Sequence, residues 1–264
     1  DTVCTIAVAD ALLRNRDFGE SLHDWCRRYP NPKGGYGGRF ASWVRSDNPQ
    51  PYNSFGNGSA MRVSPVGWWF FETSDVYNVA VQSAMCTHNH EMGIKGAACI
   101  AIAIFGALQR RNDGQKPDEI KHALLELGTN LHYDMDIKIN KVINRFDETC
   151  QGTVPVALWI IGQSYSFEEA IRRAVSLGAD ADTLGAIVGS IAEAVWGIPE
   201  WMKKKALSYL PEEMRKVVRD FRKEIKMRRE EHKQLIEQSV IMLWKLGLGN
   251  MGRCFNGENP LPDK

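Results

Sequence analysis

The stretch from Ile94 to Leu108 places the strongest constraint on the fold, because it is apolar on nearly every side of a helix. A helix of this kind has to be covered on all sides by other elements of the chain. The remaining sequence offers amphipathic helical patterns, such as those from Asp1 to Leu13 and from Phe18 to Tyr29, and no strand-period alternation of any length. The sequence therefore predicts an all-α fold, with the apolar helix at the centre of a multi-helix bundle.

Helical spacing of apolar residues recurs along most of the remaining chain. After Pro199 it continues among many charges, and Arg222–Lys233 carries so many residues of both signs that we interpret it as a solvated helical face. The segment Gly249–Lys264 has the composition of a loose tail. The other predicted helices are Phe40–Val44, Ser74–Cys86, Asp118–Leu131, Ile137–Thr149, Thr153–Ile161 and Phe167–Leu177.

The composition argues against several classes of protein. The 264 residues suffice for a substantial buried core, and the net charge of +1 gives no sign of a nucleic-acid or membrane partner. The longest apolar run, Ala97–Leu108, is too short to span a bilayer. The six cysteines are scattered without metal-ligand spacing, which favours free thiols in a reducing compartment. We therefore expect a cytoplasmic protein.

The chain begins at Asp1-Thr2, without an initiator methionine and directly within a helical pattern. Asp1 heads the first predicted helix, where its carboxylate is either an N-cap or part of a frayed terminus. We expect that residues preceding Asp1 are missing from this sequence.

The acidic motif Gly178–Gly189 contains the most informative group of polar residues. Asp180, Asp182 and Thr183 stand at the head of a predicted helix that runs through Val195. Short oxygen side chains at this position can cap free backbone N–H groups. Two neighbouring carboxylates also repel each other unless a cation or a shared proton compensates them, and hard divalent cations take such ligands. The residues alone leave both interpretations open.

Two glycine-containing loops are weaker candidates for binding. In Asn53–Val63, glycines flank Asn57 ahead of a helix, so exposed backbone N–H groups could bind phosphate or ribose oxygens. The alternative, which the residues alone favour, is a tight turn with Asn57 in a left-handed conformation. The cluster Gly34–Gly38 is weak evidence for a phosphate site.

The segment Thr87–His90 contains two histidines, His88 and His90. The nearby sequence supplies no third ligand of the kind that zinc uses. We therefore expect His90 to be a surface or capping residue.

Together these motifs resemble the ADP-ribosylglycohydrolase family, of the dinitrogenase-reductase-activating-glycohydrolase type. The resemblance extends over about Asp1 to Phe221, and Cys150–Pro155 is similar to bacterial members. It implies a single orthogonal helix bundle over 1–221, followed by a charged helix and tail over 222–264. It rests on Asp1-Thr2 at the head of a helix, on Ser54–Arg62, on Thr87-His88 and on Gly178–Thr183.

The resemblance also implies a pair of divalent cations, Mg²⁺ or Mn²⁺, in a cleft. Asp180, Asp182 and Thr183 match the family's metal ligands, and Asp182 is expected to reach both ions. Asp1 matches the last member of an earlier ligand run. Asp1 and Asp182 are the expected catalytic residues, because metal-bound carboxylates can accept a proton from water. The residues expected to bind substrate are Ser54, Phe55, Gly56, Asn57, Gly58 and Ser59 of the loop, with His88 lining the same cleft.

The implied function is divalent-metal-dependent hydrolysis of an N- or O-glycosidic bond to ADP-ribose. The partner would be an ADP-ribosylated protein or a small molecule that contains ADP-ribose. The alternatives are a non-catalytic ADP-ribose-binding module and an immunity or interaction protein that blocks an ADP-ribosyltransferase. An earlier block of the family, which includes further metal ligands, has no counterpart before Asp1, so we expect little or no turnover by this chain alone.

Overall fold

The computed structural model describes residues 1–245, which form helices joined by loops, with no β-strand among them. The all-α prediction is confirmed for this part of the chain. The chain divides into two units, Asp1–Val218 and Arg219–Lys264. The elements are α1 (Thr2–Arg14), α2 (Phe18–Arg28), α3 (Gly38–Arg45), α4 (Gly58–Arg62), α5 (Ser64–Trp69), α6 (Thr73–Met85), α7 (Glu91–Asn112), α8 (Pro117–Asn130), the 3₁₀ helix η1 (Ile139–Lys141), α9 (Cys150–Gln163), α10 (Phe167–Ser176), α11 (Ala181–Trp196), α12 (Glu200–Ser208) and α13 (Glu212–Lys245).

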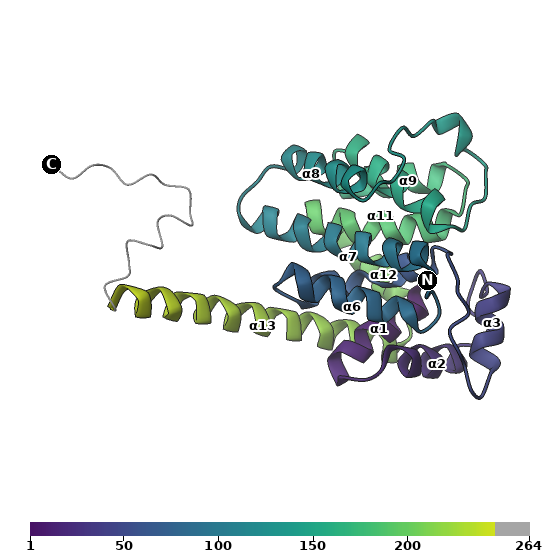
Figure 1. Cartoon of the computed structure of the whole chain (residues 1–264), viewed down its shortest axis with the longest axis horizontal. Helices are drawn as coiled ribbons and strands as arrows, with labels where there is room; N and C mark the ends of the chain where they lie inside the picture. The colour runs from purple at the N-terminus through teal and green to yellow at the C-terminus, as the bar shows by residue number, and fades with distance from the viewer. Residues whose placement is uncertain (246–264) are drawn as a thin grey trace. The chain divides into compact units, whose positions relative to one another are not determined.

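Helix α7 lies at the centre of the first unit, as its apolar sequence predicts. It contacts α4, α5, α6, α8, α9 and α11, and Figure 1 shows it between α6 and α11. The helix is longer than the run Ala97–Leu108 and has the length and composition of a membrane span. Most of it is nevertheless buried inside the bundle, as in the core helix of a globular domain.

Glycine allows neighbouring elements to approach α7 closely. A Cβ atom on Gly96 would lie 2.3 Å from Cys150 Sγ at the start of α9. On α5, a Cβ atom on Gly67 would lie 2.8 Å from the carbonyl oxygen of Ala101. Neither position has room for a side chain, so the spacing of α5 and α9 from α7 depends on these two glycines.

Helices α1 and α11 begin beside the short helix α4. Helix α11 contacts α4, α7 and α9, and α1 contacts α4 and α5. The loop before α11 turns at Gly178, which has a φ of 59° that favours glycine. The N-terminal ends of α1 and α11, which are far apart in the sequence, therefore meet in space.

The predicted helix Ile137–Thr149 is wrong. This segment contains only the short 3₁₀ helix η1 and otherwise runs as a loop. Its apolar residues Ile137, Ile139 and Val142 pack against the core without a continuous helix. Asn144 has a φ of 55° and its N–H donates to the Leu177 carbonyl oxygen, which holds the segment in this conformation.

The second unit is described only as the C-terminal part of α13, up to Lys245. Most side chains of Arg222–Lys233 are fully or partly exposed, which agrees with the solvated helical face predicted there. The predicted tail Gly249–Lys264 lies outside the described residues. The boundary at Phe221 stays a prediction.

Candidate active site

A cleft of about 730 Å³ in the first unit brings together most of the residues that the motifs single out. Its walls come from the start of α1, the loops around residues 32–40 and 52–58, the segment 146–149 and the start of α11. The predicted site residues that line it are Asp1, Ser54, Phe55, Gly56, Asn57, Gly58, His88, Asp180, Asp182 and Thr183.

Three polar residues stand at the N-cap positions of helices that begin at this cleft, and none of them caps its helix. Asp1 precedes α1, Asn57 precedes α4 and Asp180 precedes α11, each without a side-chain hydrogen bond to the helix backbone. By contrast, Asp17 and Ser166 accept such bonds at the starts of α2 and α10. Capping therefore does not account for the polar groups at the cleft.

Asn57 holds the carboxylate of Asp180 in place. Asn57 Nδ2 donates to Asp180 Oδ2 at 2.7 Å and to Thr153 Oγ1 at 3.0 Å, and all three residues are buried. Burial raises the pKa of Asp180 above its usual value, the hydrogen bond from Asn57 opposes this shift, and the neighbouring Asp182 adds to it. A positive charge at this position would stabilise the ionised carboxylate.

Asp1 and Thr183 join the starts of α1 and α11. Thr183 Oγ1 donates to Asp1 Oδ1 at 3.3 Å. Asp182 is exposed, unlike Asp180, and a Cβ atom on Gly34 would lie 3.4 Å from Asp182 Oδ2. Asp182 therefore faces the open part of the cleft, next to the glycine cluster.

The donor atoms at this place suit a hard divalent cation. Carboxylate and hydroxyl oxygens of Asp1, Asp180, Asp182 and Thr183 line one cleft, and burial together with the neighbouring Asp182 raises the pKa of Asp180. Within residues 1–245, no group of three or more His, Cys, Asp or Glu side chains is arranged to hold a metal ion. The residues fit a cation by the chemistry of their oxygen atoms, with further ligands required from water or substrate.

The loop Ser54–Gly58 passes close to His88. A Cβ atom on Gly58 would lie 3.0 Å from His88 Nε2, so a side chain here would press against the imidazole. Asn57 has a φ of −73° and its N–H donates to the Glu148 carbonyl oxygen at 2.7 Å. The left-handed turn at Asn57 is therefore wrong, and the left-handed residue of this loop is Asn53, with a φ of 54°.

His88 is a buried, neutral imidazole that lines the cleft. Burial lowers the pKa of His88 well below its usual value, and the charges of Arg62 and Arg39 lower it further. Thr87 Oγ1 accepts from Arg62 Nη2 at 2.8 Å and lies 2.7 Å from His88 Nδ1. The contact with Thr87 fixes the orientation of the imidazole ring.

Two polar residues of the motifs lie away from the cleft. Ser59 is fully buried and its Oγ donates to the Gly93 carbonyl oxygen at 2.7 Å, because the first turn of α4 directs this side chain towards α7. The structure thus places Ser59 in the core and not among the cleft residues where the resemblance put it. His90 is the N-cap of α7 and accepts from the Met92 N–H at 3.1 Å, which confirms the capping interpretation.

The cleft also contains residues that the motifs did not identify. The glycine cluster lines it and brings the cations Lys33 and Arg39 with it. Phe146 and Glu148 line it from the segment that was predicted as a helix. The glycine cluster can be seen in the sequence, but a glycine cluster alone is weak evidence for a binding site. Nothing in the sequence marks Phe146 or Glu148 as cleft residues.

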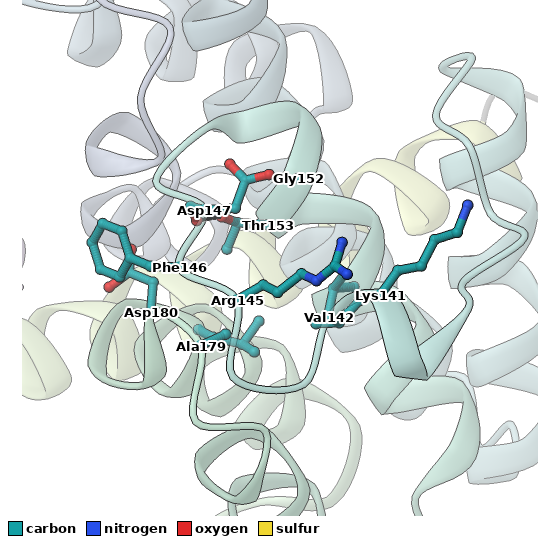
Figure 2. A pocket seen from close by; sticks show the side chains of 11 residues that line it. Lys141, Val142, Arg145, Phe146, Asp147, Gly152, Thr153, Ala179 and Asp180 are labelled. Carbon is teal, nitrogen blue, oxygen red and sulfur yellow. Dashed lines mark hydrogen bonds between the residues drawn. The ribbon is translucent and has the colours of Figure 1, made fainter.

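A second hollow of about 280 Å³ adjoins the cleft and shares Phe146 and Asp180 with it. Figure 2 shows the side chain of Arg145 extending across this hollow, whereas that of Lys141 points away from it. Phe146 is 70% exposed between the two spaces. Both hollows are built from the first unit alone.

Known proteins resemble this chain in sequence and in fold. A family model described as ADP-ribosylglycohydrolase matches residues 1–234. The ADP-ribosylhydrolase ARH3 of Danio rerio is 28% identical in an alignment 258 residues long, which covers 75% of this chain and 69% of that protein. The ADP-ribosylarginine hydrolase Tri1 of Pseudomonas putida strain GB-1 is 26% identical in an alignment 173 residues long, which covers 58% of this chain and 43% of that protein. A solved structure of an ADP-ribosylglycohydrolase-related protein complex has the same fold, with a TM-score of 0.61 and 24% identity over 84% of this chain and 80% of that one.

Proposed function

The chain belongs to the ADP-ribosylglycohydrolase family, and on this premise we propose that it hydrolyses the bond between the ribose of ADP-ribose and an acceptor. Relatives named ADP-ribosylhydrolase and ADP-ribosylarginine hydrolase support an ADP-ribosyl hydrolase function. The finer parts of the proposal are dependence on Mg²⁺ or Mn²⁺, a modified protein side chain or small molecule as acceptor, and an N- or O-glycosidic linkage.

One observation carries the proposal. Polar residues at the starts of three helices, Asp1, Asn57 and Asp180, line one cleft, and none of their side chains serves its own helix. Helix starts are usually stabilised by such residues. Here these side chains point into a cleft that is large enough for a nucleotide-sized ligand. We expect this orientation if a ligand or a cation binds the side chains in place of the helix backbone.

Divalent cations would be held by the oxygen atoms of Asp1, Asp180, Asp182 and Thr183, with Asp182 shared as the resemblance implies. When bound, they supply Lewis acidity and lower the pKa of a bound water. Asn57 fixes the orientation of the Asp180 carboxylate through its 2.7 Å hydrogen bond. Thr183 fixes Asp1 in the same way at 3.3 Å.

The remaining side chains bind the substrate and accept the proton. The loop Ser54–Gly58 and the cations Lys33 and Arg39 bind the ribose and diphosphate of ADP-ribose, since all of them line the cleft. His88 forms a hydrogen bond to the ligand through Nε2. The exposed carboxylate of Asp182 accepts the proton of the attacking water.

The second hollow offers a place for the acceptor. It shares Asp180 with the cleft, so a group bound there adjoins the carboxylates beside which the bond is cleaved. Arg145 brings a positive charge to this hollow and Phe146 an exposed ring. We therefore expect the acceptor side chain to enter this hollow while ADP-ribose occupies the larger cleft.

Five cysteines of the described residues, Cys4, Cys26, Cys86, Cys99 and Cys150, are free thiols. Free buried thiols are typical of reducing compartments. On this ground we propose that the protein works in the cytoplasm.

The test uses this chain and, in parallel, the encoded protein with any residues that precede Asp1. Each is given ADP-ribosyl-arginine or a serine-ADP-ribosylated peptide, with Mg²⁺, Mn²⁺ or a chelator. Free ADP-ribose is quantified, and the binding of ADP-ribose is measured by calorimetry. Release that requires a divalent cation and is lost in Asp182→Asn would support the proposal. Binding without release would favour the non-catalytic module, and neither binding nor release would favour the interaction protein.

A further inference from the structure

Two buried thiols face each other next to the cleft. Cys4 on α1 and Cys26 on α2 are both buried, and their Sγ atoms lie 3.8 Å apart. Cys4 also belongs to the residues that line the cleft, so only its neighbours in the cleft wall separate it from solvent. Neither thiol takes part in the proposed hydrolysis, so the hydrolysis does not explain why the two thiols lie next to each other.

The two thiols differ in acidity. The contact with Cys26 lowers the pKa of Cys4, against the opposing effect of burial. The same hydrogen bond and burial raise the pKa of Cys26. Loss of a proton from one thiol is therefore favoured while the other keeps its proton, which is the asymmetry found in reactive cysteine pairs.

The buried guanidinium of Arg62 supports the thiolate. Arg62 is 1% exposed and donates to neutral partners, the Ser83 carbonyl oxygen and Thr87 Oγ1, at 2.8 Å each. Its positive charge is one of the influences that favour ionised Cys4. A buried cation bonded to neutral groups is stabilised in turn by a nearby anion.

We propose that Cys4 and Cys26 form an oxidative modification site, at which a hydroperoxide converts the two thiols to a disulfide. The Cys4 thiolate attacks one peroxide oxygen, which breaks the O–O bond and leaves a sulfenic acid on Cys4. Cys26 then attacks the Cys4 sulfur, and the S–S bond forms as water leaves. With hydrogen peroxide, two thiols lose two electrons and two protons, and the peroxide is reduced to two molecules of water.

The disulfide would act on the start of α1. A disulfide bond is about 2.05 Å long, so the Sγ atoms, now 3.8 Å apart, must approach by about 1.8 Å. Cys4 lies within the first turn after Asp1, whose carboxylate accepts from Thr183 at 3.3 Å. A shift of α1 towards α2 changes this contact, and we expect turnover by the oxidised protein to fall at least severalfold. The effect on turnover rests on the proposed hydrolysis, whereas formation of the disulfide does not.

The first experiment maps the bond. The full chain is treated with hydrogen peroxide, remaining thiols are alkylated, and peptides are identified by mass spectrometry with and without reduction. We expect a linked Cys4–Cys26 peptide, while the buried Cys99 is alkylated only on unfolding. In the matched variant Cys26→Ser, the link is lost and dimedone labels Cys4 as a sulfenic acid. Absence of the linked peptide in wild-type protein that remains folded by circular dichroism would overturn the proposal.

The second experiment measures the consequence. Hydrolysis and ADP-ribose affinity are compared for oxidised wild type, the same sample after dithiothreitol, and peroxide-treated Cys26→Ser. A loss of turnover that dithiothreitol reverses, and that peroxide-treated Cys26→Ser does not show, would support the coupling between the disulfide and the hydrolysis site. An oxidised protein with unchanged affinity and turnover would overturn the coupling to α1. If the protein has no hydrolase activity in any state, the proposed function fails while the mapped disulfide and the affinities still decide this inference.

Discussion

Asp180 and Asp182 belong to one motif, yet their surroundings give them different tasks. Asp180 is 8% exposed and fixed by Asn57, whereas Asp182 is exposed and bordered by Gly34. A carboxylate held by a buried hydrogen bond has a fixed orientation, which suits a side chain that coordinates a metal ion. A carboxylate open to the cleft can meet water and substrate, which suits a base.

The first prediction concerns the exposed carboxylate. Asp182→Asn should lower the rate of ADP-ribose release by about a hundredfold or more, because the variant loses both the base and an anionic ligand. Its free energy of unfolding should change by less than about 0.5 kcal/mol, because the side chain is exposed. Release of ADP-ribose and urea unfolding are the measurements.

Asp75→Asn, at an exposed position on α6, is the control and should keep full activity. Wild-type turnover by Asp182→Asn at saturating Mg²⁺ would contradict the assignment.

The second prediction concerns His88 and pH. Burial lowers the pKa of His88 in the folded protein, while the unfolded chain has the ordinary value of about 6.5. The unfolded state therefore binds more protons below that pH, so stability is fully present above about 6.5 and is lost as pH falls from there towards the folded-state pKa. Between pH 7.5 and 5.5 the wild type should lose about 1 kcal/mol more unfolding free energy than His88→Gln.

Urea unfolding at each pH tests the histidine prediction. His122→Gln, which removes an imidazole that is exposed on α8, is the control for the loss of an imidazole as such. Equal pH dependence of wild type and His88→Gln would mean that His88 is not held neutral by the fold.

Some residues of the cleft could be predicted from sequence and others could not, for a physical reason. Asp180, Asp182 and Thr183 are adjacent along the chain, so their shared chemistry is visible in the sequence. Phe146 reaches the cleft only because its loop is fixed by the contact between Asn144 and Leu177, which no local pattern encodes. Ser59 shows the reverse case, since it lies within a recognised motif but points into the core.

At the scale of helices, the packing of α7 depends on where its glycines stand. Gly96 faces the start of α9, where a Cβ atom would lie 2.3 Å from Cys150 Sγ. Gly106 belongs to the same helix, but a Cβ atom there would have nothing within 4 Å. Two glycines with the same helix propensity therefore have opposite packing requirements.

The third prediction follows from this contrast. Gly96→Ala should lower the free energy of unfolding by about 1–3 kcal/mol, because α9 has to move away from α7. Gly106→Ala should raise it by up to about 1 kcal/mol, because alanine favours the helix and meets no neighbour. Thermal and urea unfolding of both variants give the comparison.

A double variant identifies the clash in Gly96→Ala. Cys150→Ala removes the Sγ atom and should restore part of the stability lost in Gly96→Ala, which a double-mutant cycle measures. If the two substitutions are additive, the contact between Gly96 and Cys150 is not what limits the approach of α9.

A helix could be predicted from the sequence where the helical spacing of apolar residues matches the way these residues pack in the fold. The apolar pattern of Ile94–Leu108 predicts a central helix, and α7 is central. Ile137, Ile139 and Val142 also have a plausible helical spacing, but they pack against the core from an irregular loop. Apolar spacing reports which residues are buried, and it does not by itself decide the backbone conformation that buries them.

At the scale of the whole chain, the candidate site belongs to the first unit. Every residue that lines the cleft lies between Asp1 and Thr183, and the second hollow extends no further than Leu184. The convergence of Asp1, Asn57 and Asp180 could not be predicted from residue patterns, because it depends on how α1, α4 and α11 contact one another. Family resemblance suggested that these residues share a site, and the fold supplies the contacts that bring them together.

The last prediction tests whether the first unit is sufficient. A chain that ends at Phe221 should bind ADP-ribose within about twofold of the full chain, because it keeps every cleft residue and has its own core. A chain that ends at Trp196 also keeps the cleft residues but loses Met214 and Val217, which are 3% and 4% exposed. Losing the burial of each such side chain costs about 1–3 kcal/mol, so this control should melt at a lower temperature. Calorimetric titration and thermal unfolding of the three chains decide the matter. Loss of binding in the chain ending at Phe221, with its helical content retained, would show that residues beyond it contribute to the site.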